Sequence, residues 1–211
     1  PVKSLTKVNI AIEQGLAAAH RIIPIIDLEN KIKLNSNKYN LVFSDGDIEF
    51  NEIKFAYNSN LDNVVLKDIS LKFSGGKMTA LVGHSGSGKS TILNMIPIIY
   101  SPLNGKITID KQNIAEVNLE SLRKEISIVD QNTTLFDDTV INNIKYAKPD
   151  ASNEEIFEAA RLAMCEDFIK KLENGYQTII GENGVKLSGG EKQRLSIARA
   201  FLKKSKIILL D

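Results

Sequence analysis

The sequence is poor in cysteine, histidine and tryptophan, with one, two and none of them in 211 residues. A lone cysteine, Cys165, excludes a disulfide framework and a metal site built from several thiolates. No stretch approaches the roughly 18 consecutive apolar residues of a membrane-spanning helix, and none resembles a secretion signal. The 27 Lys and Arg nearly balance the 26 Asp and Glu. This balance argues against a nucleic-acid module that works by bulk positive charge.

What remains is the composition of an ordinary soluble globular protein, with 43% apolar and 25% charged residues. The length suits one domain with an appendage. Cys165 lies within a helical apolar pattern, which predicts a buried and inert thiol. The first residue is Pro1 rather than Met, so we expect the chain to be part of a longer polypeptide.

Residues 1–46 differ from the rest of the chain. Apolar side chains recur there at spacings of three and four, which predicts one face of a helix: Leu5, Val8, Ile12, Leu16 and Ala19. Pro24 predicts a break or kink near Ile23, and the Asn- and Lys-rich stretch 30–38 is typical of a linker. Because the helix carries no clustered acid, base or nucleophile, we interpret it as a packing or partner helix.

The pattern changes at Asp47. Residues 48–50, 53–57 and 66–73 alternate like half-buried strands, and residues 78–82 and 207–210 are short apolar runs typical of buried strands. Helical patterns cover about 89–98, 152–172 and 190–203. Strands that alternate with helices predict an α/β fold with a parallel sheet.

A glycine-rich loop connects the expected strand 78–82 to the expected helix at 89–98. It fits the phosphate-binding pattern G-x-x-x-x-G-K-[ST], and its residues are Gly83, His84, Ser85, Gly86, Ser87, Gly88, Lys89 and Ser90, followed by Thr91. Glycines let the backbone wrap closely around an anion, and the amides at a helix N-terminus face it. A simple Gly/Ser turn with a solvated lysine fits this strand–loop–helix setting less well.

Three residues suit a nucleotide with Mg²⁺. Lys89 would neutralise the β and γ phosphates, and the Ser90 hydroxyl can ligate the metal. Asp211 directly follows the apolar run 207–210, where nucleotidases with this loop place the carboxylate that holds Mg²⁺ through water.

A second anion-binding candidate lies about 100 residues further along the chain. Its residues are Leu187, Ser188, Gly189, Gly190 and Glu191. Ser188 and Glu191 fit a helix capping box, while the hydroxyl, the glycine amides and the helix dipole suit an anion. Two such sites in one chain suggest that two copies share each nucleotide.

Together these motifs resemble the nucleotide-binding domain of ABC transporters, over about residues 46–211. The resemblance implies a P-loop NTPase (RecA-like) core with an N-terminal antiparallel β subdomain in residues 47–211, and a helical subdomain at about 132–186. It implies ATP and Mg²⁺ as cofactors. Glu191 stands where this family more often has Gln, a departure expected to act only locally.

Further segments resemble the exporter branch of the family. Tyr57 would stack on adenine, and Gln131 would touch Mg²⁺ and sense the membrane partner. The stretches 134–144 and 181–184 resemble exporter segments before the signature. Residues 17–23 with Asp27 resemble the end of a last transmembrane helix. His20 and His84 are assigned no chemistry.

The resemblance implies a mechanism in which two domains close head to tail over two ATP molecules. Closure would pull transmembrane helices attached upstream, on the cytoplasmic face of a bacterial inner membrane. The expected cargo is a lipid of the lipid A type or an amphiphilic drug, carried by a homodimer. The family's catalytic Glu would follow Asp211, so the 211-residue chain is expected to bind ATP but to hydrolyse it very poorly.

Four alternatives stay open at this point. A DNA-repair or chromosome-organising head would carry a long coiled coil and a basic stripe. An importer subunit would lack a fused helix such as 4–23. A GTPase would carry a guanine-reading N-K-x-D motif. A non-hydrolysing, ATP-dependent dimerisation module would fit the isolated chain better than its parent.

Overall fold

The computed structural model describes residues 2–26, 38–57 and 63–211. It divides into two compact units, Pro1–Ser36 and Asn37–Asp211. Residues 38–46 therefore belong to the second unit, although the sequence suggested a boundary at 46. Hydrogen bonds hold this segment in place, such as Leu41 N to Ser121 Oγ at 2.8 Å and Ser44 N to Asp110 Oδ2 at 2.8 Å. Most of the expected linker, 30–37, and Asp27 lie outside the described residues.

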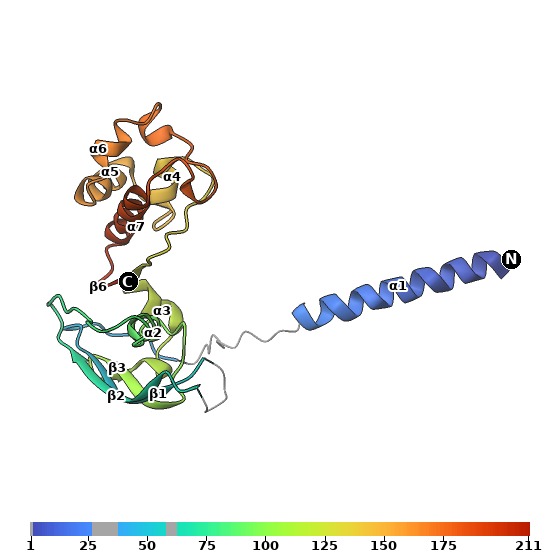
Figure 1. Cartoon of the computed structure of the whole chain (residues 1–211), viewed down its shortest axis with the longest axis horizontal. Coiled ribbons are helices and arrows are strands. Elements are labelled where there is room, and N and C mark those ends of the chain that lie inside the picture. Colours follow the sequence, from blue (N-terminus) through green and yellow to red (C-terminus); the bar gives the residue numbers. More distant parts are fainter. Residues whose placement is uncertain (1, 27–37, 58–62) are drawn as a thin grey trace. The chain divides into compact units, whose positions relative to one another are not determined.

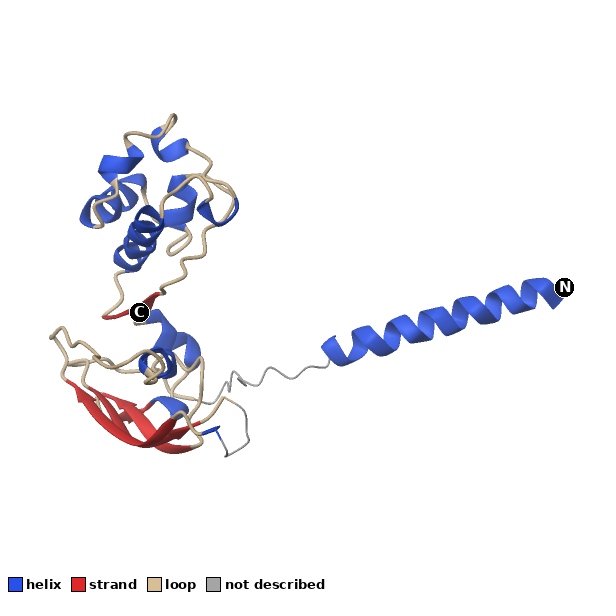
Figure 2. Ribbon diagram, viewed as in Figure 1, coloured by secondary structure: helices blue, strands red, loops and turns tan. Residues whose placement is uncertain are grey.

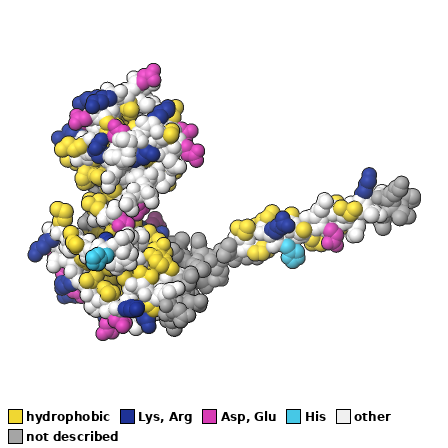
Figure 3. Space-filling model, in the orientation of Figure 1, with side chains coloured by type: hydrophobic (Ala, Val, Ile, Leu, Met, Phe, Trp, Pro, Cys, Tyr) yellow, Lys and Arg dark blue, Asp and Glu magenta, His cyan; other side chains and the backbone are white. Residues whose placement is uncertain are grey.

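The described part of the first unit is one helix, α1 (Val2–Ile26). Of the break or kink expected near Ile23, the break was wrong, because the helix continues through Pro24 to Ile26. Proline has no N–H to donate to the carbonyl of His20, so the helix continues there without that one backbone hydrogen bond. Many of its apolar side chains, including Val8, Ile12 and Leu16, are exposed, and Figure 3 shows hydrophobic side chains along the helix. No helix in the described residues combines the length and apolarity needed to cross a membrane.

The second unit begins with an antiparallel sheet in the order β2-β1-β3-β4. Its strands are β1 (Ile48–Phe55), β2 (Leu66–Phe73), β3 (Asn104–Ile109) and β4 (Gln112–Asn113) (Figure 1). The two expected strands at 48–50 and 53–57 are therefore one strand. An irregularity at Glu52, whose φ is 52°, shifts the pairing register within it. This sheet confirms the antiparallel β subdomain.

A two-stranded parallel sheet pairs β5 (Ile126–Val129) with β6 (Ile207–Leu210). The helices of this part are α2 (Lys89–Met95), η2 (Ile114–Glu116) and α3 (Leu119–Lys124). One hydrophobic cluster joins them to the antiparallel sheet, with Phe50, Met95 and Leu122 among its fully buried members. This cluster includes Ile92 and Met95 of α2, the helix that begins directly after the glycine-rich loop.

Residues 132–203 form a helical group around a second hydrophobic cluster (Figure 2). Its elements are α4 (Val140–Lys145), α5 (Asn153–Leu162), α6 (Glu166–Ile169), η3 (Gly175–Gln177), η4 (Glu182–Gly184) and α7 (Gly189–Lys203). The single helix expected over 152–172 was wrong, because Met164 adopts a φ of 55° and separates α5 from α6. Cys165 is fully buried, and burial raises its pKa to about 12, as expected of an inert thiol.

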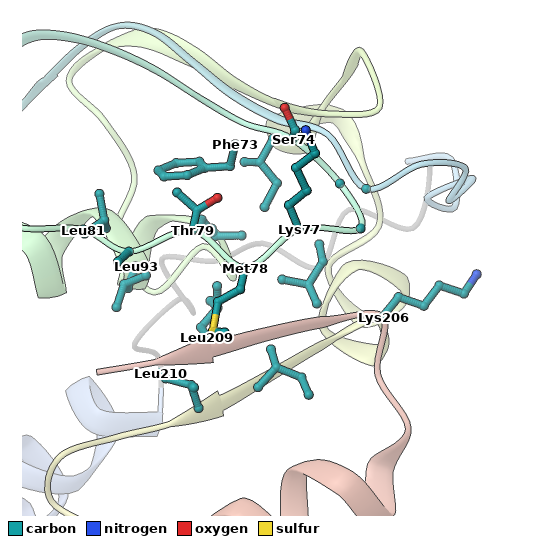
Figure 4. Close-up of a pocket in the computed structure, with 18 of the residues that line it drawn as sticks. Phe73, Ser74, Lys77, Met78, Thr79, Leu81, Leu93, Lys206, Leu209 and Leu210 are labelled. Carbon is teal, nitrogen blue, oxygen red and sulfur yellow. The ribbon is translucent and has the colours of Figure 1, made fainter.

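The strand expected at 78–82 was also wrong, because this segment has no regular secondary structure. A strand needs a hydrogen-bonded neighbour, and β6 pairs only with β5 among the described strands. A cavity of about 820 Å³ is lined both by this segment and by β6, with Phe73, Met78, Leu81 and Leu209 among its lining residues (Figure 4). Met78 and Val82 are 96% and 94% exposed.

Candidate functional site

The side chain of Lys89 hydrogen-bonds back to the glycine-rich loop that precedes it. Lys89 Nζ donates to the carbonyl oxygens of Gly83 at 3.0 Å and His84 at 2.8 Å. Ser87 N also donates to His84 O, at 3.2 Å. The ammonium group is thus held over the loop, at the N-terminus of α2, where the first backbone amides have no partner within the helix.

Two glycines shape the loop. Gly86 and Gly88 have φ values of 78° and 90°, which side-chain-bearing residues rarely adopt. A Cβ on Gly88 would also lie only 2.6 Å from Leu66 Cδ2 in β2. The loop can therefore approach a ligand closely, and its conformation depends on glycine at position 88.

The metal-ligand candidates meet at one edge of the parallel sheet. Ser90 Oγ donates to Asp211 Oδ1 at 2.9 Å. Asp211 N donates to Val129 O at 3.0 Å, so Asp211 lies beside the end of β5. Gln131 follows that same strand end and is exposed. The structure thus joins Ser90 to Asp211 directly, while within the described residues no hydrogen bond joins Gln131 to either of them.

Tyr57 follows the last residue of β1 by two positions, and its hydroxyl is hydrogen-bonded to α2. Its hydroxyl and Thr91 Oγ1 are 2.7 Å apart, and the side chain of Thr91 is buried. The ring packs edge-on against Phe55 and Tyr100, with centroid distances of 5.0 and 5.2 Å. Tyr57 itself remains 58% exposed, so its ring is available to a flat ligand at the loop. Thr91 serves to fix this ring, and its own side chain faces the interior.

The second anion-binding candidate is at the N-terminus of α7. Ser188 is the N-cap residue and forms a capping box with Glu191. Ser188, Gly189 and Gly190 are all exposed. A Cβ on Gly189 would meet nothing within 4 Å, and one on Gly190 only Arg194 Nη1 at 3.8 Å. The chain's own packing therefore does not require glycine here, whereas close approach by a ligand would.

A hydrogen-bond network around Arg199, which the sequence did not predict, joins α7 to Thr134 and Asn143. Arg199 of α7 donates to Thr134 O, Asn143 O and Asn143 Oδ1 at 2.7, 2.7 and 2.8 Å. Its guanidinium also lies 5.7 Å from the ring centre of Phe136. Burial lowers the pKa of Arg199, which still remains charged. A sequence signal was absent, because an arginine late in an amphipathic helix ordinarily predicts a solvated position.

The residues at the glycine-rich loop fit a nucleoside triphosphate with Mg²⁺. Lys89, the loop amides and the helix N-terminus suit the phosphates. Ser90 and Asp211 offer two hard oxygen ligands, and Mg²⁺ commonly takes one or two protein ligands with phosphate oxygens and waters. No cluster of three or more His, Cys, Asp or Glu is formed by the described residues.

Comparisons with known proteins agree with this geometry. The family described as ABC transporter matches residues 66–211. The ATP-dependent lipid A-core flippase of Syntrophus aciditrophicus (strain SB) is 49% identical over 211 residues, covering 100% of this chain and 35% of that protein. The protein of that name from Escherichia coli (strain K12) is 46% identical over 212 residues, covering 100% and 36%. The chain thus spans about a third of the length of these relatives.

A solved structure is similar as well. A bacterial Atm1-family ABC exporter with ATP bound matches with a TM-score of 0.92 and 40% sequence identity, covering 100% of this chain and 37% of that chain. The match confirms the predicted P-loop NTPase fold, with its antiparallel sheet and its helices.

Proposed function

Because this chain belongs to the ABC transporter family, we propose that it is the ATP-binding domain of a bacterial exporter. In this proposal ATP binding and hydrolysis drive the flipping of a lipid of the lipid A type across the inner membrane. The domain works at the cytoplasmic face, joined to its own transmembrane domain upstream. The observation that carries the proposal is the pair of phosphate-type sites, the Lys89 loop with Asp211 and the exposed Ser188–Gly190 segment, on one chain.

The first site holds the nucleotide in one copy. Lys89 is already over the loop and exchanges its two carbonyl partners for phosphate oxygens. Ser90 and Asp211 hold Mg²⁺, and Gln131 approaches it from the neighbouring strand end. The exposed ring of Tyr57 stacks on adenine. When bound, the metal neutralises phosphate charge, which is most of what phosphoryl transfer requires.

The second site completes the first from another copy of the domain. Within the described residues, no hydrogen bond or ion pair joins segment 187–191 to the loop at 83–90. Exposure and the open space around Gly189 favour contact with a partner molecule. A head-to-tail homodimer places Ser188, Gly189 and Gly190 of one copy on the γ-phosphate held by the other.

Asp211 is the carboxylate that hydrogen-bonds at the loop among the described residues, and we assign it to the metal rather than to the attacking water.

The lipid substrate is proposed from the relatives, which are named as lipid A-core flippases. The test uses the full-length protein in lipid vesicles and measures ATP hydrolysis against added lipid A precursor and, separately, amphiphilic drugs. We expect lipid to stimulate hydrolysis at lower concentration than any drug. A Lys89→Ala variant, which loses the ammonium at the loop, is the control that removes stimulation by both.

The drug arm separates two substrate classes. Stimulation by drugs alone would contradict the lipid proposal and favour multidrug export. If neither lipid nor drug stimulates ATP hydrolysis although ATP still binds, the result would contradict a homodimer that works without a different partner half.

A further inference from the structure

The hydroxyl of Ser188 is already engaged within its own chain. Ser188 Oγ donates to Glu191 Oε2 at 2.7 Å, and Ser188 N donates to the same oxygen at 2.7 Å. Both distances are typical of strong hydrogen bonds to a charged acceptor. The single hydroxyl proton of the serine therefore points to the Glu191 carboxylate.

A phosphate competes with this carboxylate for the same proton. A serine hydroxyl has one proton to donate, and phosphate oxygens can only accept. To bind a γ-phosphate, Ser188 Oγ must turn away from Glu191, and a second negative charge then stays close to the phosphate. The backbone and side-chain hydrogen bonds from Ser188 lower the pKa of Glu191, so this carboxylate is ionised at neutral pH.

The chain contains a second capping box, in which the serine hydroxyl hydrogen-bonds to the neighbouring Glu154 carboxylate rather than to that of the capping Glu155. At the start of α5, Ser152 Oγ accepts a hydrogen bond from Glu155 N at 3.3 Å. The Glu155 carboxylate is instead neutralised by Lys148 at 2.7 Å and Lys204 at 3.2 Å. No ion pair of Glu191 occurs within the described part of the chain, where Arg194 and Lys171 act on it only at longer range.

We infer that Glu191 is a positioning residue that holds the hydroxyl of Ser188 away from the nucleotide and so raises the ATP concentration needed to close the dimer. The inference rests on the proposed function, in which Ser188 meets the γ-phosphate of a second copy. It assigns a role to Glu191 beyond capping the helix. A glutamine at this position keeps an oxygen for Ser188 N but carries no charge.

The test compares Glu191→Gln with the unmodified full-length protein in lipid vesicles, with kcat and KM for ATP measured separately. We expect KM to fall about fivefold, with kcat changed by less than about twofold. A fivefold change corresponds to about 1 kcal/mol, the typical difference between a hydrogen bond to a charged and to a neutral group. Loss of helix capping alone would move the melting temperature and leave KM unchanged.

Two further variants show whether the effect passes through the hydroxyl. Ser188→Ala is expected to raise KM, and Glu191→Gln in the Ser188→Ala background is expected to give no additional gain. Glu155→Gln is the matched control from the other capping box. It breaks two ion pairs, so it is expected to lower the melting temperature slightly without changing KM.

The outcomes separate this inference from the proposed function. If Ser188→Ala raises KM but Glu191→Gln does not lower it, the role of Glu191 is refuted and the shared nucleotide site stands. If Ser188→Ala leaves both KM and kcat unchanged, the signature serine does not meet nucleotide, and the proposed site fails together with the inference. A gain in Glu191→Gln that persists without the hydroxyl also refutes it.

Discussion

Both proposed phosphate-binding sites contain glycine, but the structural requirement for glycine differs between them. Gly88 has a left-handed φ of 90°, and a Cβ there would lie 2.6 Å from Leu66 Cδ2. Gly189 has no such φ, and a Cβ there would meet nothing within 4 Å. Alanine at the two positions should therefore separate effects on folding from effects on ligand contact.

For Gly88→Ala, the left-handed conformation alone costs about 1–2 kcal/mol, and Leu66 must also move. We expect a loss of about 2 kcal/mol in the free energy of unfolding. For Gly189→Ala, the first turn of α7 gains helix propensity, worth between zero and about 1 kcal/mol. Gly189→Ala should thus be as stable as the unmodified protein or slightly more stable.

The effect of Gly189→Ala on catalysis should be opposite to its effect on stability. Its methyl group fills the space through which a partner's γ-phosphate approaches, so kcat/KM for ATP should fall at least tenfold, which is about 1.4 kcal/mol. Thermal unfolding and steady-state ATP hydrolysis of the full-length protein measure the two effects. Full activity in Gly189→Ala would refute ligand contact at this glycine, and strong destabilisation would refute the open space around it.

Three further predictions concern the supports of the site. Arg199→Met removes three hydrogen bonds and should lower the free energy of unfolding in urea by about 3 kcal/mol; a change below the error of the titration would contradict the network. Asp211→Asn keeps a partner for Ser90 but loses the charge, so ATP affinity should fall about tenfold with Mg²⁺ and stay unchanged in EDTA; equal losses in both would rule out a metal ligand. Burial alone would raise the pKa of Asp110, but hydrogen bonds from the amides of Ser44, Asp47 and Gly46 outweigh it and lower the pKa below 3.8. The stabilisation that the ionised Asp110 carboxylate gives the folded state is therefore complete above about pH 4 and is lost as the pH falls through the lowered pKa. Plots of unfolding free energy against pH for the unmodified protein and for Asp110→Asn should therefore converge at acid pH. Plots that stay parallel would contradict this prediction.

Local patterns carried much of the fold. The loop at 83–90, α2, α7 and β6 were all predicted from short motifs, because each depends on neighbouring residues in the sequence. The capping box of Ser188 and Glu191 was likewise legible in four residues. For such elements the sequence contains the physical cause of the structure.

Elements that depend on distant partners were predicted less well. Residues 78–82 have the composition of a strand, but a strand exists only when another strand pairs with it. The break between α5 and α6 depends on the left-handed conformation of Met164, for which no glycine gave a signal. The role of Arg199 depends on carbonyl groups more than 50 residues away in the chain. Sequence periodicity does not contain this information.

The central claim is that two copies of the domain share each nucleotide between the Lys89 loop and the Ser188 segment. It is tested most directly by mixing full-length protein carrying Ser85→Cys with full-length protein carrying Ser188→Cys, under oxidising conditions. The native Cys165 does not interfere, because it is fully buried and its pKa is about 12. We predict a disulfide between the two polypeptides that forms with ATP and Mg²⁺ and not without them. Failure to form it with nucleotide, or equal formation without nucleotide, would contradict the account.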